Sequence, residues 1–145
     1  MKSIALFLDK HRSEVIKIGK DLIKWFTEKG LHIYTTKNLS VKLEIETLGL
    51  EKEELLKKVD WAITLGGDGT FLKWSHWIAG SSVPLLGINL GTLGFLTEVK
   101  LSNMYTDIQK VLDGKFEIEK RMMLEVVVTV DGEKVFKDII LNDAV

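Results

Sequence analysis

Apolar residues along the first two thirds of the chain follow two spacings, one typical of strands and one typical of helices. Short continuous apolar runs, which indicate strands covered on both faces of a parallel sheet, occur at 4–8, 31–34, 61–65 and 85–89. Apolar positions three or four residues apart, which indicate amphipathic helices, occur at 15–29, 51–59, 70–79 and 102–113. Residues 35–50 mix the two spacings, and we assign no element there.

Helix caps and breakers agree with these elements. Gly30 and Gly114 each follow the last apolar position of a helix, as expected of the residue just beyond a helix C-terminus. Pro84, the single proline, lies in the break after the third helix, and Ser102 precedes the last helix as its expected N-cap. The alternation of strands and helices predicts an α/β fold with a doubly wound, mostly parallel, Rossmann-like sheet, which binds ligands at the carboxyl ends of its strands.

Beyond Phe116 the spacing changes to that of a β-hairpin. Residues 123–130 are rich in β-formers, Asp131-Gly132 is a strong two-residue turn signal, and 135–141 is the expected returning strand. We therefore place an α/β nucleotide-binding domain at 1–115 and the start of a β-rich second domain at 116–145. Two or three strands are too few to close a sheet on a core, so we expect this second domain to be incomplete.

A turn with three glycines around one carboxylate joins a buried strand to the helix that follows it. Gly66, Gly67 and Gly69 permit positive φ and let backbone N–H groups approach an anion, and the helix start directs its unpaired amides the same way. Thr70 adds a hydroxyl. Because Asp68 would repel a phosphate, we interpret it as a base or orienter for the group that attacks the phosphate. The alternative, that Asp68 only caps the helix, leaves the three glycines unexplained.

Two commoner nucleotide-binding loops are absent from the sequence. The Gly-Lys pairs at 19–20 and 114–115 lack the upstream glycine and the following Ser or Thr of a P-loop. The first strand leads into residues 9–13, which contain no glycine and therefore cannot form a dinucleotide-binding G-x-G-x-x-G turn.

A second glycine-rich block follows the fourth strand. Gly91 and Gly94 let the backbone come close to a ligand. Asn89 and Thr92 offer hydrogen bonds, and Phe95 offers a flat face for a base. The alternative is a tight connection in which Phe95 fills the core. We favour the ligand-binding interpretation once the family resemblance given below is taken into account.

Further candidate residues lie outside these two blocks. Asn142-Asp143 suits a ribose, because a carboxylate accepts hydrogen bonds from two vicinal hydroxyls, although such a pair is also common in plain turns. Lys73 lies one turn into the helix after Asp68 and is either a solvated lysine or a phosphate ligand. We interpret Arg121 as a structural residue that ties the two domains together.

Together these motifs resemble the NAD kinase family. The resemblance rests on three blocks in the family's order: Gly66-Gly67-Asp68-Gly69-Thr70, Gly87-Ile88-Asn89-Leu90-Gly91-Thr92-Leu93-Gly94-Phe95-Leu96, and Asn142-Asp143. The first block alone is shared with lipid kinases of the diacylglycerol and sphingosine type, so the specificity lies in the combination. Family members often carry Asn-Glu at the third block, and the family is longer than this chain, with most of a β-rich C-terminal domain still to follow.

The resemblance implies an ATP-NAD kinase, which transfers a phosphoryl group from ATP, or from another donor such as polyphosphate, to the 2′-hydroxyl of the adenosine ribose of NAD. Asp68 would then be the catalytic base, and the glycine turn with Thr70 and Lys73 would hold phosphates. The residues implied to contact the dinucleotide are Asn89, Thr92, Phe95, Asn142 and Asp143. We expect a divalent ion, Mg²⁺, to be held mainly through phosphates, because the sequence shows no cluster of carboxylates dedicated to it.

Composition narrows the partners. With 145 residues the chain can bury one ordinary core, and its net charge of −1, with interspersed signs, predicts no nucleic-acid or membrane partner. The absence of cysteine excludes disulfides and thiolate metal sites, and three scattered histidines make a zinc site a poor hypothesis. No signal peptide or apolar run of about 18 residues is present, so we expect a cytoplasmic protein. We also expect a homo-oligomer, a dimer or tetramer.

Two other functions stay open at this stage. A lipid kinase would use the same glycine turn, but its usual following block, Pro-x-Gly-Thr-x-Asn-Asp, is replaced here by the block at 87–95. A non-catalytic dinucleotide-binding module is the second alternative, because the chain is short. The phosphoryl donor, the acceptance of NADH and feedback by NADP are not decided by the sequence. We expect the 145-residue chain by itself to be inactive as a kinase, since Asn142-Asp143 lies at a chain end that frays unless it is held.

Overall fold

A computed structural model describes residues 2–91 and 94–142 of the chain. It shows a six-stranded sheet with the order β3-β2-β1-β4-β5-β6 and a separate two-stranded sheet, β7-β8. The strands are β1 (Ser3–Leu8), β2 (His32–Thr36), β3 (Gly49–Leu50), β4 (Trp61–Gly66), β5 (Leu85–Asn89), β6 (Val99–Lys100), β7 (Leu124–Val130) and β8 (Glu133–Ile140). The helices are α1 (Ser13–Glu28), α2 (Lys37–Leu43), α3 (Lys52–Lys58), α4 (Asp68–Ile78) and α5 (Met104–Leu112), with 3-10 turns η1 (Glu46–Leu48) and η2 (Leu101–Asn103).

The centre of the large sheet is apolar on both faces because helices cover both. All neighbouring strands in this sheet are parallel. In β1, Leu6 and Leu8 lie against Gly19 of α1, whereas Phe7 points to the other face. There its ring stacks on Trp74 of α4 with centroids 4.3 Å apart. Continuous apolar runs are therefore what this position in the sheet requires, since neither face meets water.

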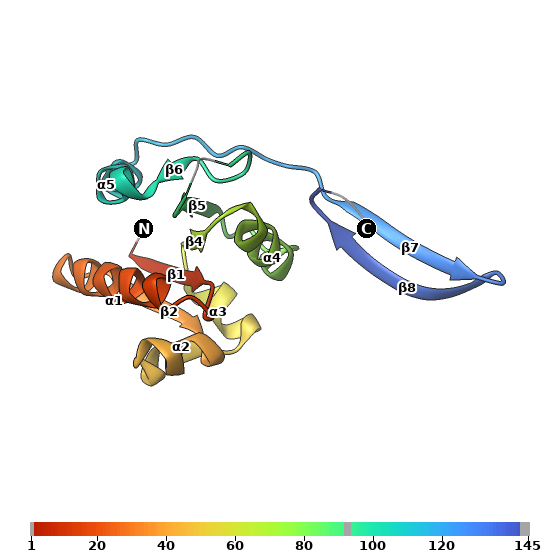
Figure 1. The fold of residues 1–145 in the computed structure, drawn as a ribbon, viewed down its shortest axis with the longest axis horizontal. Helices are drawn as coiled ribbons and strands as arrows, with labels where there is room; N and C mark the ends of the chain where they lie inside the picture. Colours follow the sequence, from red (N-terminus) through yellow and green to blue (C-terminus); the bar gives the residue numbers. More distant parts are fainter. Residues whose placement is uncertain (1, 92–93, 143–145) are drawn as a thin grey trace.

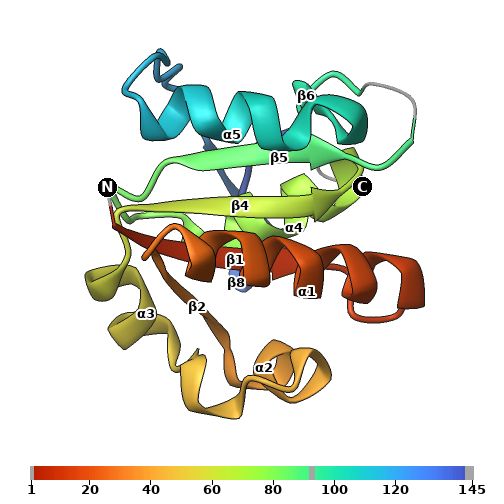
Figure 2. The same ribbon diagram turned by 90° about the vertical axis from the view of Figure 1, so that its left-hand side faces the viewer.

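Aromatic contacts show which helices share a face of the sheet. Trp25 of α1 and Tyr105 of α5 have ring centroids 5.2 Å apart, so these helices lie side by side on one face (Figures 1 and 2). On the opposite face, the Nζ atom of Lys52 in α3 lies 5.3 Å from the ring of Trp77 in α4. The predicted α/β fold with a doubly wound sheet is confirmed, and its sheet is wholly rather than mostly parallel.

Three local expectations need correction. Residues 35–50, left unassigned, contain α2, η1 and the short edge strand β3, which packs closely enough that a Cβ on Gly49 would overlap the Ser40 side chain. Helix α4 begins at Asp68, two residues earlier than expected, with Gly67 at the N-cap. Ser102 is not the N-cap of α5: it lies inside η2, and Asn103 is at the cap position without a side-chain cap bond.

The C-terminal hairpin has the turn that its sequence predicts. Asp131 has φ 52° and Gly132 has φ 84°, and two consecutive positive φ values match the twist of a two-residue hairpin turn. An extended, largely exposed segment, 113–123, leads from α5 to this hairpin, which projects away from the large sheet (Figure 1).

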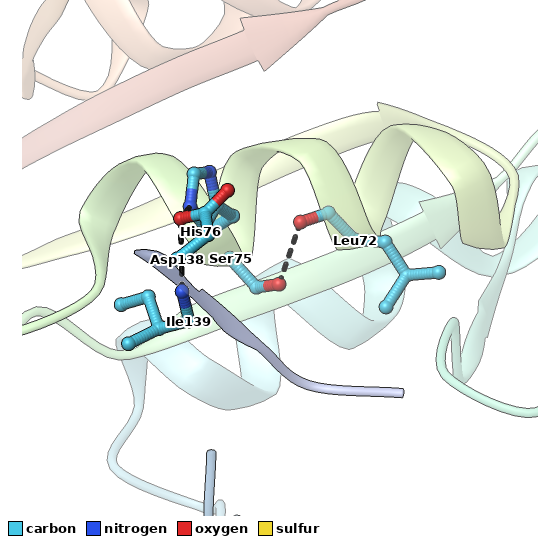
Figure 3. Close-up of polar contacts among 5 residues, drawn as sticks. All are labelled: Leu72, Ser75, His76, Asp138 and Ile139. Atoms are coloured by element: carbon cyan, nitrogen blue, oxygen red, sulfur yellow. Dashed lines mark hydrogen bonds and ion pairs between the residues drawn. The ribbon is translucent and has the colours of Figure 1, made fainter. Parts of the chain in front are cut away.

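One side-chain hydrogen bond joins the hairpin to the α/β part. Within 2–91 and 94–142 it is the single hydrogen bond between these parts. His76 Nε2 of α4 and Asp138 Oδ1 of β8 are 2.7 Å apart. Figure 3 draws this contact as a dashed line. The same oxygen accepts a bond from the backbone N–H of Ile139. Arg121, expected to tie the domains together, instead pairs with Glu119 in the connecting segment at 2.8 Å. His76, which the sequence did not single out, has the role we gave to Arg121.

Candidate functional site

The glycine turn lies at the topological switch point of the sheet. Strands β1 and β4 are neighbours, but the chain leaves β1 towards β2 on one side and leaves β4 towards β5 on the other. Ligands of open α/β sheets bind outside the carboxyl ends of the strands at such a point. Gly66 ends β4 and Asp68 begins α4, so the turn occupies this position.

Gly66 is needed for space, and none of the turn glycines has a positive φ. Among the described glycines, positive φ occurs at residues 30, 80, 114 and 132 and at none of the turn. A Cβ on Gly66 would overlap the side chain of Thr70. By contrast, a Cβ on Gly67 or Gly69 would meet no atom of the described residues within 4 Å. Our φ argument is therefore wrong for this turn, and the open side of Gly67 and Gly69 leaves room for a ligand at the start of α4.

Asp68 is held by the second glycine-rich block rather than by its own helix. Its carboxylate accepts bonds from the backbone N–H groups of Phe95 (2.8 Å), Leu96 (3.2 Å) and Thr97 (3.2 Å). The Thr97 hydroxyl donates a fourth bond at 3.0 Å. Helix α4 has no side-chain cap bond, so the alternative in which Asp68 serves as a helix cap is wrong. The first two sequence blocks meet at this carboxylate.

Gly94 explains how the loop comes so close to the turn. A Cβ at this position would overlap the Asp68 carboxylate. Only a residue without a side chain leaves the carboxylate its place against the loop. Gly94 therefore belongs to the same arrangement as the amides of 95–97.

The hydrogen bonds to Asp68 have an electrostatic consequence. Partial burial raises the pKa of Asp68, but the bonds from Phe95, Thr97 and Leu96 outweigh it and hold the pKa below the usual range of an aspartate. Asp68 is therefore ionised at neutral pH, and in that form its carboxylate accepts hydrogen bonds and is a weak base.

Asn89 contributes to the same network from the end of β5. Its side chain is 5% exposed, donates from Nδ2 to the Thr97 hydroxyl at 2.7 Å, and accepts at Oδ1 from the N–H of Gly91 at 2.8 Å. Both ends of the amide are thus bound within the chain. Asn89 positions the loop in this structure, and its expected contact with a dinucleotide stays a prediction.

The remaining predicted site residues are placed differently. Phe95 is 97% exposed, so the alternative in which it fills the core is wrong. Asn142 is exposed just after β8, and within the described residues its side chain makes no hydrogen bond to the turn. Thr92 and Asp143 lie outside the described residues. The geometry therefore unites the first two blocks and does not place the third.

A small cavity opens beside the turn. Its volume is about 170 Å³ and its lining residues come from the end of β1 and from α4: Leu8, Asp9, Gly69, Thr70, Lys73 and Trp74. Lys73 is exposed and brings a positive charge to this cavity, and its role as a phosphate ligand stays a prediction. Asp9 was missed by sequence reasoning. Its place directly after the first strand would have revealed it, because the carboxyl ends of β1 and β4 meet at one edge.

The described ranges contain neither a metal-binding cluster nor a helix that could cross a membrane. No group of three or more His, Asp or Glu side chains within 2–91 and 94–142 is arranged to hold a metal ion. In the same ranges, none of the helices combines the length and the apolar character that crossing a membrane requires.

Comparison with known proteins places these features in a family. A model described as the ATP-NAD kinase N-terminal domain matches residues 4–116. The NAD kinase of Citrifermentans bemidjiense is 37% identical over 147 residues, which cover 100% of this chain and 51% of that protein. The NAD kinase of Geobacter sulfurreducens is 37% identical over 145 residues, with the same coverage. The chain thus spans about half the length of the curated relatives it matches.

Solved structures show the same fold. A yeast NADH kinase complexed with NADH superposes with a TM-score of 0.81 at 18% identity, covering 98% of this chain and 47% of the yeast chain. An NAD kinase from Archaeoglobus fulgidus in complex with ATP gives a TM-score of 0.54 at 22% identity, covering 96% of this chain and 59% of that chain. The family match, the glycine turn at the switch point and the loop bound to its carboxylate lead to one conclusion: this chain belongs to the NAD kinase family and corresponds to its N-terminal half.

Proposed function

We propose that this chain carries the catalytic carboxylate of an NAD kinase, which transfers a phosphoryl group from ATP, or from polyphosphate, to the 2′-hydroxyl of the adenosine ribose of NAD. The observation that supports this most directly is the position of Asp68. Its carboxylate lies at the switch point of the sheet and is bound by four donors from the loop at 95–97. A carboxylate that only stabilised a helix start would not need a loop assembled around it.

In the proposed reaction, Asp68 binds the ribose hydroxyl and accepts its proton as the new bond to phosphorus forms. With its pKa held low, Asp68 is too weak a base to ionise a hydroxyl in advance. Orientation of the hydroxyl towards the phosphorus must therefore supply most of the rate, as is usual in phosphoryl transfer.

The start of α4 fits the phosphates of a donor such as ATP. Its first amides have no partner within the helix, and the positive end of the helix dipole favours an anion there. The open sides of Gly67 and Gly69 let a phosphate approach the backbone, and Lys73 adds charge at the neighbouring cavity. When bound, ATP supplies the transferred group. The chain supplies the amides, the Thr70 hydroxyl and the lysine that hold it.

The described residues do not fit a dedicated magnesium site. They contain no group of three or more acidic or histidine side chains arranged to hold an ion, and Oδ1 of Asp68 is already engaged by the loop. Mg²⁺ would therefore be held through the donor's phosphates.

Phe95 is the best supported of the proposed dinucleotide contacts. Its ring is almost fully exposed, while its backbone N–H is fixed on Asp68. A phenyl ring held in water beside the catalytic carboxylate gains by stacking on a base. Asn89, Thr92, Asn142 and Asp143 complete the proposed contacts. The domain bounds 1–115 and 116–145, a homo-oligomeric state and a cytoplasmic location remain predictions.

The test is NADP formation by a fusion in which the C-terminal half of the Citrifermentans bemidjiense NAD kinase follows Val145. With ATP, Mg²⁺ and NAD, the fusion should form NADP. Asp68→Asn should lower its turnover by ~10² to 10⁴, the usual effect of losing a general base, with little change in NAD affinity. Asp21→Asn, an exposed carboxylate on α1, is the matched control and should leave turnover unchanged.

Two results would contradict the proposal. Phosphorylation of diacylglycerol in micelles without NADP formation would move the chain to the lipid kinases. Near-normal turnover in Asp68→Asn would remove Asp68 from the role of base, and NAD binding without any phosphoryl transfer would indicate a non-catalytic binding module.

A further inference from the structure

Thr97 links the end of β5 to the catalytic carboxylate, a position that none of the sequence motifs indicated. It is 1% exposed and lies just beyond the second glycine-rich block. Its hydroxyl oxygen is 2.7 Å from Asn89 Nδ2 and 3.0 Å from Asp68 Oδ1. Its backbone N–H also reaches Asp68 Oδ1, at 3.2 Å.

The direction of this hydrogen-bond chain is fixed by its first member. The N–H of Gly91 can only donate, so the Asn89 oxygen that it contacts is the acceptor and Nδ2 faces Thr97. The amide nitrogen in turn can only donate, so the Thr97 oxygen accepts. The single hydroxyl proton of Thr97 is then left for Asp68. Each bond determines the direction of the next.

The two carboxylate oxygens of Asp68 accept different numbers of hydrogen bonds. Oδ1 accepts three bonds, from the N–H of Leu96 and from the N–H and hydroxyl of Thr97. Oδ2 accepts one, from the N–H of Phe95. Because a carboxylate oxygen has two lone pairs, Oδ1 is fully used within the chain and Oδ2 retains one lone pair.

We propose that Thr97, directed by Asn89, is a positioning residue that fixes Oδ1 of Asp68 and so presents Oδ2 to the attacking ribose hydroxyl. This inference rests on the proposed role of Asp68 as the base. It adds which oxygen receives the proton: the ribose O–H bond breaks as the O–P bond forms, and the proton moves to Oδ2.

Charged side chains near Asp68 do not account for the lowered pKa of its carboxylate. Asp9 follows β1, Lys73 is on α4, and Glu98 and Lys100 flank the start of β6. None of these four forms a hydrogen bond or ion pair with Asp68 in the ranges that the structure describes. The Thr97 hydroxyl therefore acts on Asp68 independently of these charges, and a substitution can remove it.

The first experiment is a pH titration of the Asp68 carboxyl carbon by ¹³C NMR in the 145-residue chain. Thr97→Val keeps the shape and removes the hydroxyl, so the pKa of Asp68 should be higher than in the unmodified chain, because a donor that favours the ionised form is lost. Thr97→Ser restores the hydroxyl and should return the pKa towards its original value. An unchanged titration in Thr97→Val would overturn the proposal.

A second measurement needs no variant and covers the case in which Thr97→Val does not fold. In the unmodified chain, the buried Thr97 hydroxyl proton should exchange slowly with water, and its resonance should move with the titration of Asp68. A hydroxyl resonance that does not shift as Asp68 titrates would contradict the proposed direction of the hydrogen bond.

Turnover separates this inference from the proposed function. In the fusion protein, Thr97→Val should lower kcat by about 10- to 100-fold, as when the hydrogen-bond partner of a metal-binding side chain is lost, while the KM for NAD changes little. Thr97→Ser should lower kcat by a smaller factor. If the NMR shifts occur but no variant forms NADP, the carboxylate is positioned as proposed and the kinase assignment fails.

Discussion

The size of a single residue decides how the site can be assembled. Gly94 lies directly against the Asp68 carboxylate, and Gly66 lies against Thr70, so a Cβ at either position would occupy the place of another side chain. The Gly94 contact lets the loop reach the turn, and the Gly66 contact lets the end of β4 lie against the start of α4. Both depend on close packing, which is why glycine is required although φ is not positive.

Gly94→Ala is expected to destabilise the chain by ~1–3 kcal/mol, the typical cost of forcing a methyl group into a packed site. It should also break the bonds between Asp68 and the amides of 95–97. Urea unfolding measures the first effect, and amide hydrogen exchange at 95–97 measures the second. Gly91→Ala is the matched control, because among the described residues its Cβ would meet only Asn89 Oδ1, at an ordinary 3.8 Å. Equal stability of the two variants would show that the loop tolerates a methyl group at Gly94.

At the scale of single residues, the sequence indicated the candidate site residues better than it indicated their contacts. Asp68 stands out because a carboxylate among glycines is unusual, and Phe95 stands out as an aromatic residue in a loop. Thr97 and Asp9 are ordinary residues whose importance comes from burial and from the meeting of strand ends, which composition and spacing do not report. The φ argument failed because glycine can be needed for close approach alone.

Helices and strands were predictable where the apolar pattern extends over the whole element. Strands β1 and β4 and helix α1 follow from continuous or periodic apolar residues. The segment containing α2, η1 and β3 did not, because each of these elements is short and depends on its neighbours, as the contact of Gly49 with Ser40 shows. The hairpin turn was predictable from two residues, since only a few residue types tolerate two successive positive φ values.

The bond between α4 and β8 should make the position of the hairpin sensitive to acid. The hydrogen bond from His76 and the N–H of Ile139 hold the pKa of Asp138 below its usual range. A pKa lowered in the docked state means that the contact is fully present above the undocked value of ~3.9 and is lost as the pH falls through the lower, docked value. Both side chains are about half exposed, so we expect a small effect.

Spin labels can measure this effect cleanly, because the chain has no cysteine of its own. With one introduced cysteine on α4 and one in the hairpin, the distance distribution should be narrow at neutral pH and should broaden on acidification. Asp138→Asn should broaden it already at neutral pH. The control, Glu125→Gln, removes a partner of Lys137 inside the hairpin and should not. A narrow distribution in Asp138→Asn would mean that this bond does not hold the hairpin.

At the scale of the whole molecule, the C-terminal hairpin stands out because no hydrophobic core within the described residues covers its apolar side chains. Apolar side chains remain about half exposed on both of its strands, including Val128 (45%) and its cross-strand partner Phe136 (53%). The chain spans about half of its curated relatives, and the sheet that would cover these side chains is not formed by the described residues. An exposed two-stranded sheet of this kind favours association with other chains.

We therefore expect the 145-residue chain alone to form far less NADP than the fusion protein and to scatter more light at equal concentration. A displacement of about 1 Å in a reacting group costs ~10²-fold in rate, so a weakly held hairpin is enough to suppress activity. Phe136→Lys should reduce the scattering, whereas Asn38→Lys, which adds the same charge on α2, should not. Equal activity of a monomeric 145-residue chain would show that the second half is dispensable.

The donors that surround Asp68 have a consequence for how such a site changes over evolution. Three of the four are backbone amides, which every residue except proline provides. Mutations at positions 95 and 96 can therefore alter what the loop presents to a substrate while the carboxylate keeps its donors. Under the proposed function, selection can act on substrate preference through the exposed ring of Phe95 while Asp68 keeps its donors, whereas Thr97 and Gly94 have no such freedom.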